Sequence, residues 1–243
     1  MKLEGKSALV VGLGKSGVAA ARLLALKGAR VVPADDKPAA QLREVLQQLG
    51  LSEVRPVAPQ SLRGVDLVVV SPGVSPTLRI FIEARAQGLP VLGEIELAAR
   101  YIDEPVLGIT GTNGKSTTTA LTAHLLERSG LSVFAGGNLG DPLSNRVLRG
   151  GRLDVTVCEL SSYQLEGIVE LRCAAATVLN VTPDHIERHP SLESYAKAKE
   201  RIFLNQRSGD AAALNAADPR VAAMRTNPGV ARHEFDPRLP RAS

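Results

Sequence analysis

The sequence contains no tryptophan and few other aromatic residues, with three Tyr and four Phe among 243 residues. Proteins that bind single-stranded nucleic acid stack bases on aromatic side chains, so this chain is poorly suited to that role. The formal net charge is only +4, and the basic residues are scattered along the chain. We therefore expect no nucleic-acid partner and favour small ligands that carry phosphate.

Cysteine and long hydrophobic runs are also scarce. The two cysteines, Cys158 and Cys173, lie in apolar surroundings without the spacing of metal ligands. We therefore expect buried, reduced thiols, no disulfide and a cytoplasmic location. No stretch approaches the roughly 18 apolar residues of a membrane span, and charged residues and glycines interrupt the one segment, 7–29, that resembles a signal peptide. We expect no membrane insertion.

The sequence does contain a repeated alternation of short apolar runs and longer helical patterns. Runs that are apolar throughout predict parallel strands covered on both faces, and several intervening segments end near glycine, as helices do. These units predict an α/β fold. Strands are expected at 7–11, 29–34, 66–70, 90–92, 106–110, 131–135, 154–158, 174–179 and 211–214, and helices at 18–27, 39–49, 78–87, 93–100, 116–129 and 192–205.

A glycine-rich loop follows the first expected strand. The letters VVGLGKSGV place the pattern Gly-x-Gly-x-x-Gly between a strand and a helix, which is the context of a phosphate-binding loop. Gly12 permits a tight turn, Gly14 lets the backbone approach an anion, and Gly17 lets helix and strand pack closely. Lys15 and Ser16 add a charge and a hydroxyl donor, and the helix N-terminus adds free N–H groups.

Acidic residues at the end of the second expected strand extend this site. Asp35 lies where such loops commonly hold a ribose or base, and Asp36 and Lys37 follow it. These groups suit either NAD or a uridine diphosphate, so both ligands stay open at this point. A turn with no ligand is a further alternative, because one fingerprint of this kind is weakly specific.

A second phosphate-binding pattern follows the fifth expected strand. The letters GTNGKST resemble a P-loop, although Ile109 occupies the position of the first glycine in the strict pattern. Lys115 supplies a positive charge and Ser116 a hydroxyl for Mg²⁺, while the loop glycines allow a backbone nest around phosphates. The expected nucleotide-binding residues are Gly111, Thr112, Asn113, Gly114, Lys115, Ser116 and Thr117.

Other polar residues have two interpretations each. Glu159 ends an apolar strand, where nucleotidases place a metal-binding acid, but acids are also favourable near a helix start such as Ser161. Composition alone favours an ordinary loop residue for Asn138 and His185 and a solvated helix face for Lys199.

The two phosphate-binding patterns predict two separate sheets, since one open sheet normally offers one such site.

A series of motifs resembles the Mur ligase family in content and order. They are GLGKSG at 12–17, SPG at 71–73, GEIEL at 93–97, GTNGKST at 111–117, GGN at 136–138, ELSSYQLE at 159–166 and NVTPDH at 180–185. Together they are highly specific, and the resemblance covers about residues 5 to 235. The first loop and the 159–166 string resemble the D-glutamate-adding branch more than the L-alanine-adding one.

The resemblance implies that 1–93 is a Rossmann-like domain that binds a UDP-sugar and not NAD. Lys15 and Ser16 match positions that contact the diphosphate, 35–37 match those that meet uracil, and 71–73 close the pocket. The implied substrate-binding residues are Gly14, Lys15, Ser16, Gly17, Asp35, Asp36, Lys37, Ser71, Pro72, Gly73 and Asn138.

For 94–243 the resemblance implies an incomplete P-loop-type parallel α/β ATPase domain, and it implies that a C-terminal amino-acid-binding domain is absent. Lys199 matches the lysine that the family carbamoylates. The implied catalytic residues are Lys115, Asn138, His185 and Lys199, and the implied Mg²⁺ ligands are Ser116, Glu159, His185 and Lys199. The last residues, 225–243, are rich in Arg and Pro, and we expect them to be frayed.

The implied activity is ATP-dependent C–N bond formation in peptidoglycan synthesis, and hence a role in cell shape and division. UDP-N-acetylmuramoyl-L-alanine would form an acyl phosphate that D-glutamate attacks. If the 243 residues are the entire polypeptide, we expect a monomer that binds both nucleotides without ligation. Two alternatives stay open: an NAD-dependent oxidoreductase based on the first loop alone, and a truncated, non-catalytic nucleotide-binding module.

Overall fold

The computed structural model describes residues 1–138, 140–184 and 189–238. The chain divides into two compact units, Met1–Ile102 with Pro142–Gly150, and Asp103–Asp141 with Gly151–Ser243. Two units agree with the two sheets expected from the sequence. Their limits differ from a boundary at residue 93, because the segments 94–102 and 142–150 pack with the first unit.

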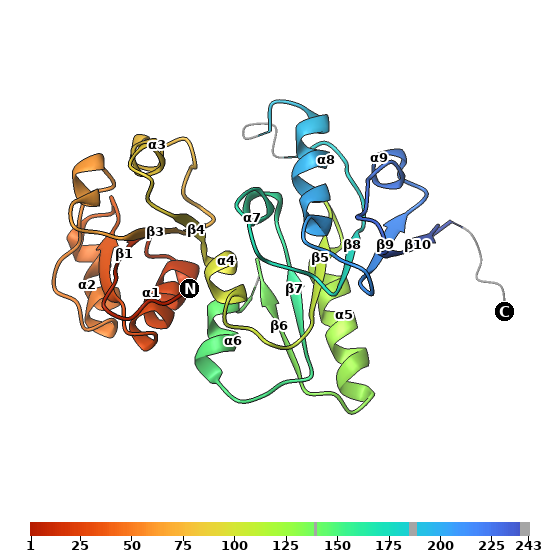
Figure 1. Cartoon of the computed structure of the whole chain (residues 1–243), viewed down its shortest axis with the longest axis horizontal. Helices are drawn as coiled ribbons and strands as arrows, with labels where there is room; N and C mark the ends of the chain where they lie inside the picture. Colours follow the sequence, from red (N-terminus) through yellow and green to blue (C-terminus); the bar gives the residue numbers. More distant parts are fainter. Residues whose placement is uncertain (139, 185–188, 239–243) are drawn as a thin grey trace. The chain divides into compact units, whose positions relative to one another are not determined.

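The first unit is built on a four-stranded parallel sheet in the order β2-β1-β3-β4 (Figure 1). Its strands are β1 (Ser7–Val11), β2 (Arg30–Ala34), β3 (Leu67–Val70) and β4 (Val91–Gly93). Its helices are α1 (Lys15–Leu26), α2 (Ala39–Gln48), α3 (Arg79–Ala86), α4 (Glu94–Ala99) and α6 (Leu143–Arg149), with a short 3₁₀ helix η1 (Pro59–Leu62).

The apolar strands of this sheet form its core. Leu9 and Val68 pack with Phe81 of α3 in one buried cluster, while α1 packs against α4 and α6. The β1–α1–β2 and β3–α3–β4 crossovers run in opposite directions along the sheet, so their right-handedness places α1 and α3 on opposite faces. The strand order therefore reverses between β1 and β3, which is where open α/β sheets bind ligands.

The second unit is built on a six-stranded parallel sheet in the order β10-β9-β8-β5-β7-β6. Its strands are β5 (Val106–Thr110), β6 (Val133–Gly137), β7 (Val155–Glu159), β8 (Ala175–Val178), β9 (Ala211–Asn215) and β10 (Ala231–Phe235). Its helices are α5 (Lys115–Arg128), α7 (Ser162–Glu166), α8 (Leu192–Glu200) and α9 (Pro219–Ala222), with a 3₁₀ turn η2 (Arg201–Phe203) after α8.

Helices lie on both faces of this sheet. Ala123 of α5 packs with Ile109 and Val157, and on the other face a Cβ at Gly108 would lie 3.0 Å from Ile202 of η2. Cys158 and Cys173 are both buried thiols, as expected. The crossovers that follow β5 and β8 run in opposite directions, so the order reverses between these two neighbouring strands.

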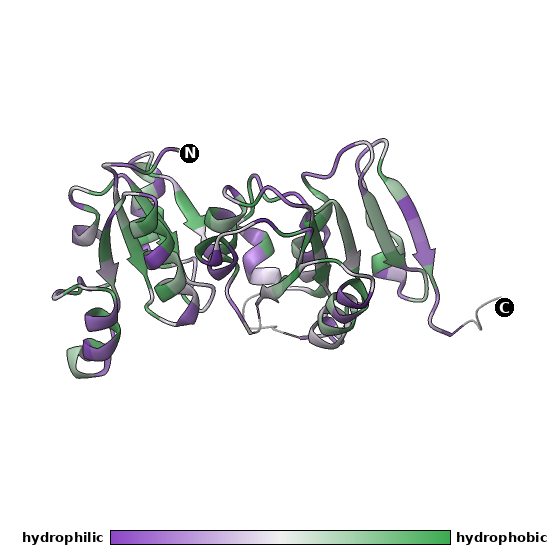
Figure 2. Ribbon diagram, turned by 90° about the horizontal axis from the view of Figure 1, so that it is seen from below, coloured by the Kyte–Doolittle hydropathy of each residue, from purple (hydrophilic) through white to green (hydrophobic). Residues whose placement is uncertain are grey.

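The expectation of a frayed tail is wrong for residues 231–235. They form β10, which pairs in parallel with β9, as in the register of Ala231 with Ala211. All five residues are exposed, and the strand is purple over much of its length in Figure 2. Its sequence, ARHEF, contains no apolar run, so nothing in it predicted a strand.

In the described parts of the chain, no helix has both the length and the hydropathy of a membrane span.

Candidate functional site

The first candidate site is the loop between β1 and α1. Gly14 is the N-cap of α1, so the first-turn N–H groups have no acceptor within the helix. A Cβ on Gly17 would lie 1.8 Å from the carbonyl oxygen of Gly12, which confirms the close packing expected at this glycine. A Cβ on Gly14 would meet nothing within 4 Å. The loop thus leaves open space beside free backbone donors.

Two side chains hold this loop in place. The Ser71 hydroxyl donates to the carbonyl oxygen of Gly12 at 2.7 Å. The Asp35 carboxylate accepts the N–H of Leu13 at 2.7 Å and that of Lys37 at 2.9 Å. The sequence pointed to Asp35 as a ligand contact and missed its role in fixing the loop.

The other expected residues of this site follow the ends of neighbouring strands. The segments 12–17, 35–37 and 71–73 come after β1, β2 and β3, which are adjacent in the sheet, so they share its carboxyl edge. Asp36 is exposed, and its Oδ1 accepts the N–H of Val57 at 2.8 Å. Of the remaining members, Lys15, Lys37 and Gly73 are exposed, and Ser16 and Pro72 are half-buried.

The second candidate site is the loop between β5 and α5. Gly114 caps α5 with φ +82°, a left-handed conformation that glycine adopts without strain. Lys115 begins the helix, and its Nζ donates to the carbonyl oxygen of Thr112 at 2.8 Å. Ser116 and Thr117 occupy the first turn and are exposed. The expected strand–loop–helix arrangement is therefore present.

Asn180, which follows β8, fixes this second loop. Its Oδ1 accepts the N–H of Thr112 at 3.0 Å and that of Asn113 at 2.8 Å, and its Nδ2 donates to the carbonyl oxygen of Asn113 at 3.1 Å. Asn180 is not among the site residues expected from the sequence. The NVTPDH string that begins with this residue is the signal from which it could have been found.

Glu159 ends β7, as expected, and is 2% exposed. Its Oε1 accepts a hydrogen bond from Asn138 Nδ2 at 3.1 Å, and the backbone N–H of Asn138 donates to the carbonyl oxygen of Glu159 at 2.9 Å. Ser161 caps α7 through its own side chain. Two expected site residues thus meet at the ends of the neighbouring strands β6 and β7.

Lys199 lies inside the protein, so the expectation of a solvated helix face is wrong. The residue is 1% exposed, and its Nζ donates to the carbonyl oxygen of Gly111 at 2.7 Å. Burial lowers the pKa of Lys199 from 10.5 to about 7, the positive charge of Lys115 adds to the shift, and Asp184 opposes it. This lysine therefore adjoins the loop between β5 and α5, and burial weakens its hold on the proton.

His185, an expected catalytic residue and metal ligand, lies outside the described residues. Among the residues that the structure does describe, no group of three or more His, Cys, Asp or Glu side chains is placed to hold a metal ion. The described members of the expected metal set are Ser116, Glu159 and Lys199.

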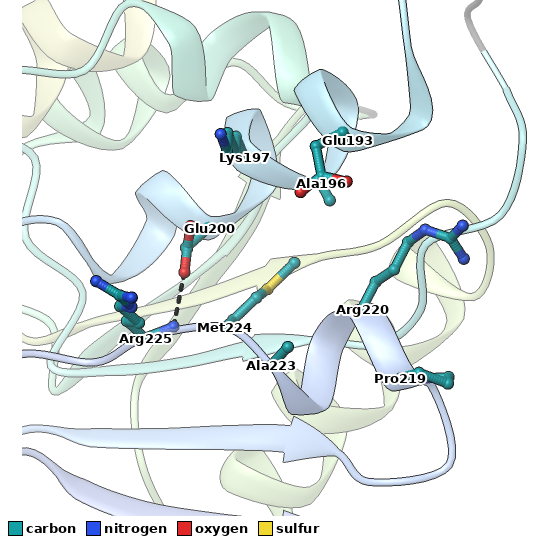
Figure 3. Close-up of a pocket in the computed structure, with 9 residues that line it drawn as sticks. All are labelled: Glu193, Ala196, Lys197, Glu200, Pro219, Arg220, Ala223, Met224 and Arg225. Carbon is teal, nitrogen blue, oxygen red and sulfur yellow. Dashed lines mark hydrogen bonds between the residues drawn. The ribbon is translucent and has the colours of Figure 1, made fainter.

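A separate hollow of about 790 Å³ lies between α8 and the α9 region (Figure 3). Glu193, Lys197 and Glu200 line one side, and Arg220 and Arg225 line the other. The backbone N–H of Arg225 donates to Glu200 across it at 2.6 Å. Its lining contains none of the expected site residues, so we do not include it in the site.

Two family models match this chain. One, described as the Mur ligase MurD-like N-terminal domain, matches residues 6–93, and the other, described as the Mur ligase middle domain, matches residues 109–237. The chain belongs to the Mur ligase family. The match confirms the family resemblance of the motifs.

Curated Mur ligases are similar to this chain over nearly all of its length. A UDP-N-acetylmuramoylalanine–D-glutamate ligase of Anaeromyxobacter dehalogenans is 52% identical over 92% of this chain and 49% of its own length. A ligase of the same name from Myxococcus xanthus is 50% identical over 91% of this chain and 50% of its own length. The chain spans about half the length of these relatives.

Solved Mur ligase structures share the fold. The ligase of Neisseria that acts on UDP-N-acetylmuramate and L-alanyl-γ-D-glutamyl-meso-diaminopimelate has a TM-score of 0.65 at 19% identity, over 95% of this chain and 78% of that one. The UDP-N-acetylmuramate–alanine ligase of Thermotoga maritima has a TM-score of 0.55 at 23% identity, over 90% of this chain and 51% of that one. They confirm the α/β fold of parallel sheets.

Proposed function

We propose that residues 1–243 carry the two nucleotide-binding parts of a cytoplasmic ligase that adds D-glutamate to UDP-N-acetylmuramoyl-L-alanine. The observation that carries this proposal is a glycine loop at the point of strand reversal in each of two sheets, with buried Lys199 beside the second loop. The relatives whose sequences are 52% and 50% identical to this chain bear the name of this ligase.

The first site would bind the UDP part of the substrate. The free N–H groups of the first turn of α1, with Lys15 and Ser16, suit a diphosphate, because anions are favourable at a helix N-terminus. Open space at Gly14 leaves room for that approach. The segments 35–37 and 71–73 lie at the same sheet edge and would enclose uracil and close the pocket.

The second site would bind Mg²⁺-ATP. The loop residues 111–117 and the Lys115 ammonium suit the phosphates. Glu159 is a buried carboxylate whose side chain contacts the Asn138 amide, and the Ser116 hydroxyl lies in the first turn of α5. Oxygen donors of this kind fit Mg²⁺, which when bound neutralises charge on the transferred phosphoryl group. We propose His185 as a further Mg²⁺ ligand because of the motif in which it stands.

Lys199 would become a carbamate. Its neutral amine would attack CO₂, forming the N–C bond and releasing one proton, so an ammonium would be replaced by an anion. The pKa of about 7 supports this step, because burial leaves a substantial neutral fraction at physiological pH. The carbamate oxygens would add to the ligand set formed by Ser116 and Glu159. ¹³C NMR with labelled bicarbonate would detect the carbamate directly.

The proposed reaction follows from the weakness of a carboxylate as an electrophile. The carboxylate of the L-alanyl residue would take the γ-phosphoryl group of ATP, the amine of D-glutamate would attack the acyl phosphate, and phosphate would leave. Proximity of the amine and carbonyl groups would supply much of the rate. For residues 1–243 alone we expect binding of both nucleotides without ligation, and peptide-bond synthesis by this chain would contradict that expectation.

Calorimetric titration separates this proposal from an oxidoreductase. We expect heat from UDP-N-acetylmuramoyl-L-alanine and from Mg²⁺-ATP, each with one site, and none from NADH. An oxidoreductase built on the first loop would bind NADH and would have no use for the second loop. Binding of NADH in place of the uridine nucleotide would overturn the proposal.

A further inference from the structure

A buried histidine joins two helices beside the second site. His189 is 4% exposed, and its Nε2 lies 2.9 Å from the hydroxyl of Ser162, the first residue of α7. Its Nδ1 lies 3.5 Å from a carboxylate oxygen of Glu166. Because His189 stands two residues before the N-cap of α8, these contacts fasten the start of α8 to α7.

The set Ser162, His189 and Glu166 has the residue types of a nucleophile, a base and an orienting acid. Burial argues against that chemistry, since Ser162 is only 2% exposed and its hydroxyl already pairs with the imidazole. A substrate carbonyl would have no access to this oxygen. The cluster therefore holds structure in place and does not perform covalent catalysis.

From His189, a chain of contacts leads to the phosphate loop. The imidazole ring lies 4.9 Å from the ring of Tyr195, and that ring lies 4.3 Å from Lys199 Nζ. Lys199 in turn donates to the carbonyl oxygen of Gly111, the first residue of the loop. His189 is thus connected to the loop through Tyr195 and Lys199.

A lysine needs such support, because its long stem has several rotatable bonds and fixing it costs conformational entropy. The Tyr195 ring provides one wall for the Lys199 ammonium, and the His189 ring packs against that wall. Loss of the imidazole would remove a group packed against Tyr195 and would loosen the contact of Lys199 with the loop.

We propose that His189 is a positioning residue of the nucleotide site. Its imidazole fixes Tyr195, Tyr195 supports the Lys199 ammonium, and Lys199 holds the loop 111–114 at Gly111. This inference rests on the proposed function, since it assigns His189 to the same nucleotide site.

Hydrogen exchange tests the structural part of the proposal without any nucleotide. Two variants weaken the cluster gently: Ser162→Ala removes the hydroxyl, and His189→Phe keeps a ring. We expect amide exchange in 111–114 to accelerate roughly five-fold in both, with exchange in 12–17 unchanged. His233→Ala, on exposed β10, is the matched control. Unchanged exchange in 111–114 in both variants would overturn the proposal.

A double-mutant cycle tests whether His189 acts through Lys199. Mg²⁺-ATP dissociation constants are measured for the wild type, His189→Phe, Lys199→Gln and the double variant. We expect the double variant to bind about as weakly as Lys199→Gln alone, because the two residues act in series. Additive losses would show a merely structural role for His189 and would overturn the proposal. A wild type without Mg²⁺-ATP affinity would instead contradict the proposed function, and the exchange result would still decide the role of His189.

Discussion

Gly14 and Gly17 stand three residues apart in one loop but have opposite steric surroundings. A Cβ at Gly17 would lie 1.8 Å from a backbone oxygen, whereas one at Gly14 would meet nothing within 4 Å. The Gly14 backbone is extended, with φ −73°, so any residue adopts it. The first glycine is therefore free for ligand approach, and the second is required for packing.

Alanine at these two positions should separate folding from binding. We expect Gly17→Ala to lower the free energy of unfolding by about 2 kcal/mol, because the loop must shift to relieve the overlap. Gly14→Ala should change stability by less than about 0.5 kcal/mol and weaken binding of the uridine nucleotide. Urea unfolding followed by circular dichroism measures the stability of both variants, and calorimetry measures the binding of the uridine nucleotide. Equal destabilisation of the two variants would contradict these separate roles for Gly14 and Gly17.

Lys199 should make stability depend on pH. Its pKa falls from 10.5 to about 7 on folding, chiefly through burial. Between these values the unfolded chain binds a proton that the folded chain has released, so the free energy of unfolding rises with pH. Below about pH 7 the folded and the unfolded chain both hold the proton, so the free-energy cost of burying the ammonium does not change with pH.

We expect Lys199→Met to remove this slope. The wild type should gain up to about 1.4 kcal/mol of stability per pH unit relative to the variant between pH 7 and 10. Urea unfolding at a series of pH values measures the difference. Parallel curves for the two proteins would show that Lys199 keeps its proton when folded.

Local chemistry explains which site residues the sequence could identify. The glycines, Lys115 and Ser116 act within one loop, so their pattern is visible in a few consecutive letters. Asn180 acts on Thr112 from 68 residues away, and the burial of Lys199 depends on contacts with Gly111 and Tyr195. Such contacts arise from tertiary packing, which single-sequence patterns do not contain.

At the scale of elements, the apolar strands were predictable because both faces of a parallel sheet are buried. The expected strand 106–110 has the same limits as β5, and 7–11 the same as β1. The short helices α6 and α7 were missed, since a few residues carry little helical periodicity. β10 was missed because backbone pairing with β9 forms it, without an apolar face.

The N-cap of α8 offers a test at this scale. Ser191 Oγ accepts the N–H of Ser194 at 3.1 Å and completes a capping box. We expect Ser191→Ala to lower the free energy of unfolding by about 1 kcal/mol, with Ser52→Ala, in an exposed loop, as the control. Equal stability of the two variants would show that the cap contributes nothing to α8.

At the scale of the whole molecule, each unit repeats one design. In the first, the loops after β1 and β3 meet through Ser71 and Gly12, and in the second, the loops after β5 and β8 meet through Asn180 and Thr112. Both meetings lie where the strand order reverses. The chain therefore has two glycine-containing loops in separate sheets, and if both bind phosphate as we propose, each should work without the other.

Crossed titrations with the two nucleotides show whether the two loops bind independently. UDP-N-acetylmuramoyl-L-alanine and Mg²⁺-ATP are titrated separately by calorimetry into the wild type, Gly14→Val and Lys115→Met. We predict that Gly14→Val loses the uridine nucleotide and keeps ATP, and that Lys115→Met weakens ATP about a hundredfold and keeps the uridine nucleotide. Loss of both ligands in either folded variant, or a wild type that binds neither, would contradict the account.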